Sequence, residues 1–364
     1  MEFVEFFTGG GGAHIGLRAA GLTPRLAVEW NADCRETIRL NDPHVTIDDA
    51  DMFEFTVGDV MKRNGIGPDF AGLIWLSPPC QGISEAGKKQ GKEDPRNNLL
   101  YTVSAACRYA PNAWVVMEQV PGLLMGKAKP LFRKLKRKIR KAKRKYTAWK
   151  LTATDFGLAQ KRKRLFLVCP PVGQPVPPKP QGNWAGLPPK MLMEVIHPKC
   201  GFEDPDPKII PLLPNEKVLM QGIPPGRNWT TAFRAREYML GYWMRRKAKG
   251  KDLGDVMPKY PGHLRRLSWH EPAPTVIASW PQAFNFRVHP CHPQEDRYLT
   301  NGECRELQGF PRSYLIYGSE QTEINSKGQK KKITPAMSRR RQIGNAVPPP
   351  FAEKIGRPIL ASAT

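Results

Sequence analysis

The chain has 364 residues, which is long enough to bury one large core and a smaller second lobe. Its formal net charge of +24 attracts polyanions, so nucleic acid is the first partner to consider and an acidic membrane surface the second. The seven cysteines are odd in number and never form a CxxC pair, which argues against a disulfide framework or a zinc ribbon. Since no basic leader or long apolar stretch is present, we expect a cytoplasmic protein without a membrane span.

Short apolar runs alternate with helix-compatible segments through the first half of the chain. A glycine turn at 9–12 follows the first run, and a helix over 13–20 follows the turn. This alternation predicts an α/β fold, a Rossmann-like, doubly wound and mostly parallel sheet with helices on both faces. The expected strands cover 2–7, 25–28, 70–76, 113–117, 146–152 and 165–169.

Prolines recur from Pro170 to Pro189, where neither a helix nor a central strand can persist. We therefore predict a catalytic and cofactor-binding domain over 1–171, a smaller irregular domain over 172–270 and a C-terminal segment over 271–364. The last part of that segment, 342–364, contains a turn and a helix-like stretch that we expect to pack back on the first domain.

Residues 127–145 carry Lys or Arg at most positions, with Leu131, Phe132, Leu135 and Ile139 at helical spacing. The pattern predicts a basic amphipathic helix. Two interpretations remain open: a solvated outer helix whose apolar stripe packs on the sheet, and a helix that contacts phosphates.

The glycine turn lets backbone approach a ligand closely and directs helix amides towards it. Glu29 ends the second expected strand, where its carboxylate could accept both hydroxyls of a ribose, and Trp30 offers a flat face for an adenine ring. Asp59 could accept a hydrogen bond from the adenine amino group. Together these residues indicate a nucleoside site, although each acid taken singly is more often a solvated surface residue.

Cys80 lies in Ser77-Pro78-Pro79-Cys80-Gln81, directly after an apolar run, so we expect it on a stiff loop at the carboxyl end of a strand. A cysteine after a strand is often only a small buried apolar group. The glycines and charges that follow Cys80 favour an exposed loop and hence a nucleophile, for which a nearby helix terminus or cation must stabilise the thiolate.

Two further segments place charged groups beside expected strands. Glu118 ends the strand 113–117 and could face Cys80. Arg162 and Arg164 lie in Gln160-Lys161-Arg162-Lys163-Arg164, where strand alternation sends both guanidinium groups to one side, suited to a phosphate and a base oxygen.

The order of these segments resembles the DNA (cytosine-5)-methyltransferase family over nearly the whole chain outside 172–270. The matching segments are EFFTGGGGAHIGLRAAG, Glu29-Trp30, Gly58-Asp59-Val60, SPPCQGIS, DPRNNL, Glu118-Gln119-Val120, QKRKR, RYLT, ELQGFP and QIGNAVP. One such match is weak evidence, but this many in family order is specific.

The resemblance implies an S-adenosylmethionine-dependent enzyme that acts on double-stranded DNA as a monomer, without a metal, through transient bonding of Cys80 to carbon 6 of a flipped-out cytosine. Residues 172–270 would be its target-recognition domain. Residues that would hold the cofactor are Phe7, Thr8, Gly9, Gly11, Glu29, Trp30, Asp59, Val60, Pro79, Leu99, Asn345 and Val347, and those at the cytosine Cys80, Glu118, Arg162 and Arg164. Candidate DNA contacts are Gln81, Ser84, Arg96, Arg227, Arg234, Arg265 and Arg266.

Two departures from the family pattern affect this picture. Gln119 replaces the family's asparagine, which changes how Glu118 is held, and Ala13-His14 replaces the aromatic position common after the first glycines. His289, Cys291 and His292 lack a partner cluster at ligand spacing, so a zinc site is disfavoured.

Three other functions are compatible with parts of the sequence. An RNA (transfer RNA) methyltransferase of the same fold would share every catalytic residue, but the sizeable domain over 172–270 favours DNA. A catalytically silent DNA-binding relative should lack Cys80 or Glu118. A nicotinamide-dependent dehydrogenase would explain the glycine turn and Glu29, but would leave Cys80 and the QKRKR segment without purpose.

Overall fold

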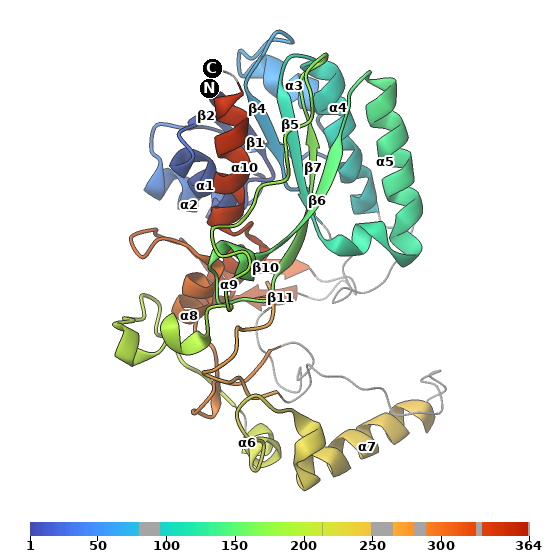
Figure 1. The fold of residues 1–364 in the computed structure, drawn as a ribbon. Coiled ribbons are helices and arrows are strands. Elements are labelled where there is room, and N and C mark those ends of the chain that lie inside the picture. The colour runs from blue at the N-terminus through green and yellow to red at the C-terminus, as the bar shows by residue number, and fades with distance from the viewer. Residues whose placement is uncertain (80–94, 213, 249–264, 280–288, 325–329, 363–364) are drawn as a thin grey trace.

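The computed structural model describes residues 1–79, 95–212, 214–248, 265–279, 289–324 and 330–362. The chain forms a large sheet-containing lobe and a smaller lobe beside it, and both termini lie at the end of the large lobe that is far from the small one (Figure 1). Cys80, Gln81 and Ser84 lie outside the described residues.

A seven-stranded sheet forms the centre of the large lobe, in the order β3-β2-β1-β4-β5-β7-β6. Its neighbouring pairs from β3 through β5 are parallel, whereas β7 runs antiparallel to both β5 and β6. This arrangement confirms the predicted α/β fold with a mostly parallel sheet. The strands are β1 (Glu2–Phe6), β2 (Thr23–Val28), β3 (Thr46–Asp48), β4 (Leu73–Leu76), β5 (Trp114–Gln119), β6 (Thr147–Thr152) and β7 (Lys163–Cys169).

Helices cover both faces of this sheet (Figure 1). One face packs against α3 (Val57–Arg63), α4 (Thr102–Tyr109) and α5 (Lys129–Lys141). The opposite face packs against α1 (Gly12–Ala19), α2 (Ala32–Asn41) and α10 (Pro349–Ala361).

The sequence of β5 shows why both faces are covered. All six of its residues, Trp114 to Gln119, are buried, as expected for a strand that buries both sides. Trp114 and Val116 join the core on the α1 and α10 side, whereas Val115 and Met117 join the core on the α4 and α5 side. A continuous apolar run therefore serves two cores.

The contact between α1 and α10 depends on a glycine. A Cβ atom added at Gly16 would lie 2.2 Å from the backbone oxygen of Pro349 and 2.8 Å from the Cβ of Ala352. Since no larger residue fits without displacing α10, Gly16 permits the close packing of the C-terminal helix on the first helix of the chain.

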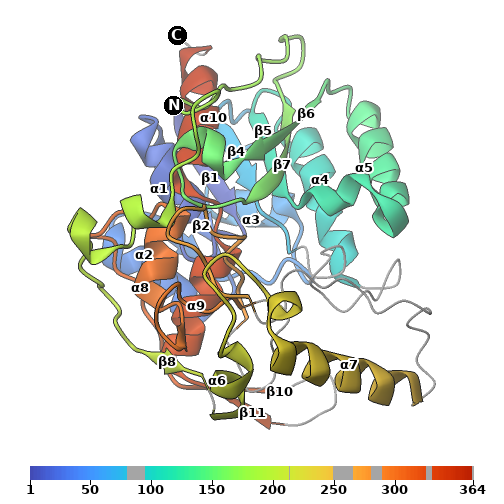
Figure 2. The same ribbon diagram turned by 60° about the horizontal axis from the view of Figure 1, so that its bottom comes forward.

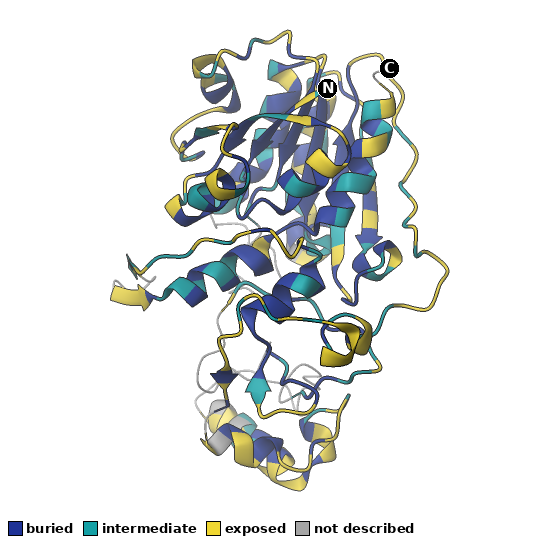
Figure 3. Ribbon diagram, turned by 90° about the vertical axis from the view of Figure 1, so that its left-hand side faces the viewer, coloured by how far each residue is buried: buried dark blue, intermediate teal, exposed yellow. Residues whose placement is uncertain are grey.

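The small lobe contains little regular structure. Its own core joins Ile210, Met220, Trp229, Met239 and Tyr298, and its helices expose much of their surface (Figure 3). Residues 170–190 have no helix or strand, as their prolines predict. The elements here are β8 (Ile210–Pro211), α6 (Pro214–Met220), α7 (Phe233–Ala248) and β9 (Arg297–Tyr298).

A layer of helices lies between the two lobes (Figure 2). Leu307 and Ile343 of this layer pack with Ala159 beside β7 and with Leu192 and Leu267 of the following segments. The layer consists of α8 (Asn301–Gln308) and α9 (Pro335–Asn345). Between these helices in the chain lie the antiparallel strands β10 (Gln321–Ile324) and β11 (Lys330–Ile333). The layer forms one wall of the cleft described next.

Candidate active site

A cleft of about 610 Å³ opens at the edge of the sheet where the parallel strands end. Residues that follow β1, β2, β3 and β4 line it, together with the end of β5, the start of β7 and the wall formed by α9. Parallel α/β sheets place their ligands at this edge. The cleft is of the size that holds a drug-sized ligand.

The glycine turn forms the floor of the cleft. Phe7 and Gly9 both have positive φ angles, 59° and 56°, so the chain turns sharply after β1. A Cβ at Gly9 would meet nothing within 4 Å, whereas one at Gly12 would lie 2.2 Å from the backbone oxygen of Val347. Of the residues predicted to hold the cofactor, Phe7, Thr8, Gly9 and Val347 line the cleft, whereas Gly11 is the N-cap of α1 and does not.

Glu29 lies at the end of β2 and is buried on the wall of the cleft. Its two carboxylate oxygens accept hydrogen bonds from the backbone N–H groups of Gly9, at 2.8 Å, and Asn31, at 2.9 Å. Burial raises the pKa of Glu29, and the two amide donors oppose this rise. The Trp30 ring beside it is 66% exposed at the cleft.

The structure corrects the sequence prediction that Asp59 and Val60 hold the cofactor. Asp59 caps α3, since its carboxylate accepts a hydrogen bond from the Thr56 backbone N–H at 3.0 Å, and Val60 is fully buried in the core. Neither residue lines the cleft. The residues after β3 take that place: Asp51, Met52 and Phe53 all line the cleft.

Three residues connect the end of β4 to Cys80 in the sequence, and all three border the cleft. Ser77, Pro78 and Pro79 line the cleft, and the backbone oxygen of Pro78 accepts a hydrogen bond of 2.8 Å from the Gln119 amide. The oxygen of that amide also accepts from the Val120 backbone N–H at 3.0 Å. Gln119 therefore ties the end of β5 to the segment that carries Cys80.

Glu118 and Arg164 meet at the opposite wall of the cleft. The Nε atom of Arg164 lies 2.7 Å from Oε1 of Glu118, and the two side chains are only 13% and 11% exposed. Because β7 is antiparallel to β5, its first residues lie at the edge where β5 ends, which explains the contact. Burial raises the pKa of Glu118, and the Arg164 guanidinium opposes this rise.

Arg162 does not reach the cleft, which corrects its predicted role beside Arg164. Its side chain is fully buried, and its guanidinium donates hydrogen bonds to the backbone oxygens of Val276, Gly344 and Ala346. Arg162 therefore holds the turn between α9 and α10, including Asn345, against β7. Asn345 itself lines the cleft.

Several cleft residues are ones that the sequence did not indicate. Glu323 of β10 and Ser338 and Arg341 of α9 line the cleft, and Arg341 forms an ion pair with Glu323. Arg341 directly precedes Gln342-Ile343-Gly344-Asn345, a segment that resembles a family motif. This neighbouring motif is the sequence signal that could have indicated Arg341 as a cleft residue. The predicted Arg96 and Leu99, from the 3₁₀ helix Pro95–Tyr101, also line the cleft.

The candidate DNA contacts of the small lobe separate into two groups. Arg227 and Arg234 are exposed, whereas Arg265 is partly buried and lies 3.1 Å from Glu271. Arg266 is buried and binds the backbone oxygens of Ile223 and His292 as well as the Asp296 carboxylate. Arg266 thus stabilises the lobe, which corrects its prediction as a DNA contact.

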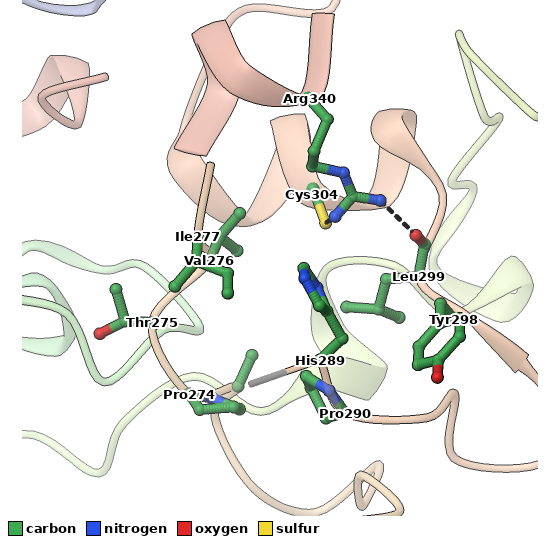
Figure 4. A pocket seen from close by; sticks show the side chains of 11 residues that line it. Pro274, Thr275, Val276, Ile277, His289, Pro290, Tyr298, Leu299, Cys304 and Arg340 are labelled. Carbon is green, nitrogen blue, oxygen red and sulfur yellow. Dashed lines mark hydrogen bonds between the residues drawn. The ribbon is translucent and has the colours of Figure 1, made fainter. Parts of the chain in front are cut away.

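A second cavity, of about 20 Å³, lies between the lobes around His289 (Figure 4). It has room for about one water molecule. Cys304 and Arg340 approach from above, and Arg340 donates to the Leu299 backbone oxygen. Among the described residues, no group of three or more His, Cys, Asp or Glu side chains is arranged to hold a metal ion.

Comparison with known proteins identifies the family. The family model for the C-5 cytosine-specific DNA methylase matches residues 1–361. The chain belongs to this family. The Type II methyltransferases M.Sau96I of Staphylococcus aureus and M.Eco47II of Escherichia coli are both 28% identical to it, over 98% of this chain and 75% and 78% of theirs.

Solved structures related to this C-5 cytosine-specific DNA methylase share its fold. A putative DNA modification methyltransferase encoded within an E. coli prophage is 18% identical, with a TM-score of 0.64 and 99% of both chains covered. The Spodoptera frugiperda DNMT2 structure is 18% identical with a TM-score of 0.56, again over 99% of both chains. Within the described ranges of this family member, no helix is both long and apolar enough to cross a bilayer.

Proposed function

We propose that this DNA cytosine-5 methyltransferase transfers the methyl group of S-adenosylmethionine to carbon 5 of a flipped-out cytosine, with Cys80 as a covalent nucleophile. One observation carries the proposal. A single cleft joins the glycine turn and Glu29 on one wall, the Pro79 residue that precedes Cys80, and the Glu118–Arg164 pair on the other wall. A donor and a base can therefore occupy adjoining parts of one site.

The residues on the first wall fit a sulfonium nucleoside. Asp51 and Glu29 offer carboxylates, the Trp30 and Phe53 rings are 66% and 54% exposed, and Gly9 leaves open space beside the backbone. We assign the ribose hydroxyls to Glu29, the adenine ring to Trp30 and Phe53, and the adenine amino group to Asp51. S-adenosylmethionine supplies an electrophilic methyl group to carbon 5 of the cytosine.

The second wall would activate the base. Carbon 5 of cytosine is a poor nucleophile until the Cys80 thiolate bonds to carbon 6, while Glu118 donates a proton to ring nitrogen 3. The raised pKa of Glu118 supports this proton donor, and Arg164, which lies 2.7 Å from Glu118, would bind the base carbonyl oxygen. After methylation, loss of the carbon-5 proton to water re-forms the double bond between carbons 5 and 6 and expels the Cys80 thiolate, and ring nitrogen 3 returns its proton to the Glu118 carboxylate.

A cytosine stacked in a duplex cannot reach such a cleft, so we infer that the target base flips out, at a cost of a few kcal/mol that DNA contacts offset. The net charge of +24 and the exposed Arg227 and Arg234 support duplex DNA as the substrate. The related Type II methyltransferases indicate a restriction-modification setting. We further propose that the protein acts as a monomer without a metal.

A pair of cysteine variants tests the proposal. Cys80→Ala should abolish transfer of labelled methyl groups to duplex DNA and leave S-adenosylmethionine binding nearly intact. The control is Cys200→Ala, because the free Cys200 thiol is exposed and remote in sequence from the cleft residues. If the Cys80→Ala variant still methylates DNA, the assignment of Cys80 as the nucleophile is refuted.

The same assay separates DNA from RNA as the substrate. Duplex DNA and transfer RNA are offered in parallel, and bisulfite sequencing locates the modified cytosine. We expect methylation of DNA only. Preferential methylation of transfer RNA would overturn the assignment of the substrate while leaving the fold and family unchanged.

A further inference from the structure

The outer surface of α5 carries a dense group of positive charges that the proposed chemistry does not use. From Gln119 to Thr154 the sequence contains no Asp or Glu. Phe132, Leu135 and Ile139 are buried against the sheet and fix the helix in place. The remaining positions are mainly cationic: Lys129, Arg133, Lys134, Lys136, Arg137, Lys138, Arg140 and Lys141.

This charge pattern opposes the stability of the helix. Arg133, Arg137 and Lys141 follow one another at four-residue spacing, which sets like charges side by side. No acid lies in the first turn of α5, where the helix dipole favours negative charge, and Lys129 begins the helix. In the described part of the chain, no cation of α5 forms an ion pair with an acid. A polyanion would relieve this repulsion.

The position of α5 connects this surface to the cleft. The 3₁₀ helix Pro95–Tyr101 contributes Arg96 and Leu99 to the cleft wall. At its other end, the Tyr101 ring lies 5.0 Å from Nζ of Lys134 and 5.2 Å from Nζ of Lys138. The basic helix therefore packs on a segment that borders the candidate active site.

The small lobe extends on the same side of the molecule. In both Figure 1 and Figure 2, α7 lies below α5, on the side of the molecule away from α1 and α10. Arg234, Arg236, Arg245 and Lys247 of α7 are exposed. A duplex that passes the cleft between these helices would run along positive charge after it leaves the target site.

We propose that the exposed face of α5, defined by Arg133, Arg137 and Lys141, binds the phosphate backbone of duplex DNA flanking the target site. This inference rests on the proposed DNA substrate and adds a contact outside the cleft. A helix of this length spans about 20 Å, or roughly six base pairs. The contact is to phosphates, so it raises affinity without reading sequence.

The test compares two triple variants that lose the same charge. The surface variant is Arg133→Ala/Arg137→Ala/Lys141→Ala, which keeps Lys134 and Lys138 on Tyr101. The control is Lys62→Ala/Lys179→Ala/Lys199→Ala, which removes exposed lysines outside α5 and the cleft. Affinity is measured against KCl concentration for a 14-bp and a 40-bp duplex, both centred on the cytosine that bisulfite sequencing assigns.

For the 40-bp duplex, log affinity decreases with log salt concentration, so the slope is negative. Its magnitude should become smaller by about 0.9 for each phosphate that the protein no longer neutralises, and so by up to about 2.7 for the surface variant. The control variant should keep the parent's slope, and both should match the parent on the 14-bp duplex. Melting temperatures without DNA should not fall for the surface variant, because like-charge repulsion is relieved.

Equal slopes for the parent and the surface variant on the 40-bp duplex would overturn the proposal. An equal reduction of the slope on the 14-bp duplex would also overturn it, since the contact would then belong to the cleft. Tighter binding of a 40-nucleotide single-stranded RNA, abolished in the surface variant, would show that the occupant is RNA. Binding to phosphates requires neither methyl transfer nor a particular sequence. If the parent methylates no duplex DNA, the proposed function is refuted, and the same slopes are then measured on 14-bp and 40-bp duplexes of mixed sequence.

Discussion

Burial at the strand ends sets the charge states of the acids in the cleft. Glu29 and Glu118 are both buried, and burial raises the pKa of each carboxyl. Two backbone amides oppose the rise at Glu29, which suits a permanent hydrogen-bond acceptor. At Glu118 the guanidinium groups of Arg164 and Arg162 oppose the rise, but the pKa stays raised, which suits a group that has to give and regain a proton.

Gln119 stands where the family has asparagine, and the structure gives the longer amide a specific contact. Its hydrogen bond to Pro78, two residues before Cys80, should position the nucleophile. We expect Gln119→Ala to lower the single-turnover methylation rate by about tenfold to a hundredfold, because small misplacements of reacting groups are costly. S-adenosylmethionine affinity, measured by calorimetry, should change little. An unchanged methylation rate would contradict this role.

Asp51 and Asp59 form a matched pair for testing the cofactor wall. Asp51→Ala should weaken S-adenosylmethionine binding by about tenfold or more, because a hydrogen bond to a charged group is worth about 1.5–3 kcal/mol. Asp59→Ala should leave the dissociation constant unchanged and lower the melting temperature slightly through loss of the α3 cap. If Asp59→Ala weakens S-adenosylmethionine binding and Asp51→Ala does not, Asp59 holds the cofactor, as predicted from the sequence, and Asp51 does not.

His14 links the protein's stability to pH. Its Nδ1 lies 3.4 Å from the buried Glu5 carboxylate and its Nε2 lies 3.0 Å from Asp42, which also contacts Arg18. Burial alone would lower the pKa of His14, but Asp42 and Glu5 together raise it. The stabilisation by protonated His14 is therefore complete below pH 6.5 and is lost as the pH rises through the raised pKa.

Urea unfolding at two pH values tests this link. His14→Gln should lower the unfolding free energy at pH 6 by about 1.5–3 kcal/mol, the range of a charge-assisted hydrogen bond, and by much less at pH 9. Exposed His270→Gln serves as the control. An equal loss at both pH values would show that His14 acts only by packing.

The sequence was informative where a residue directly follows an apolar strand, as with Glu29 and Glu118. It was misleading for Asp59, because the Gly-Asp-Val letters fit a motif while their local role is a helix cap with Thr56. It was also misleading for Arg162, since strand alternation does not apply to a residue that precedes the first strand position, Lys163.

At the scale of elements, strand pairing explains what could not be anticipated. The short β3 has only three residues and no apolar run, so periodicity did not reveal it. The reversed direction of β7 depends on its tertiary pairing with β5 and β6, yet it is this reversal that brings Arg164 to Glu118. The expected α/β alternation was correct because β1, β4 and β5 are strongly apolar.

The packing of α10 on α1 gives a prediction at this scale. Gly16→Val should destabilise the protein by about 1–3 kcal/mol, because the added side chain meets the Pro349 backbone and Ala352. The control is Gly241→Ala in α7, where the nearest atom lies 3.4 Å away. Thermal unfolding of both variants measures the difference. Equal melting temperatures would contradict the close contact between the two helices.

At the scale of the whole molecule, the proposed chemistry and the proposed phosphate contacts belong to different parts of the fold. The sheet edge supplies the two walls of the cleft, while the small lobe and α5 carry exposed cations outside it. The chain's charge excess could be recognised from composition alone, but its distribution depends on which arginines are buried as structural anchors. Arg144, for example, is buried among the backbone oxygens of Ala113, Cys169 and Pro170.

The covalent step is the central claim, and mass spectrometry of a trapped complex tests it most directly. A duplex with 5-fluorocytosine at the target position is incubated with the protein and S-adenosylmethionine. Because fluorine cannot leave carbon 5 as a proton does, we predict a stable adduct on the proteolytic peptide that contains Cys80. An adduct on another residue, or methylation of unmodified DNA by a Cys80→Ala protein, would contradict it.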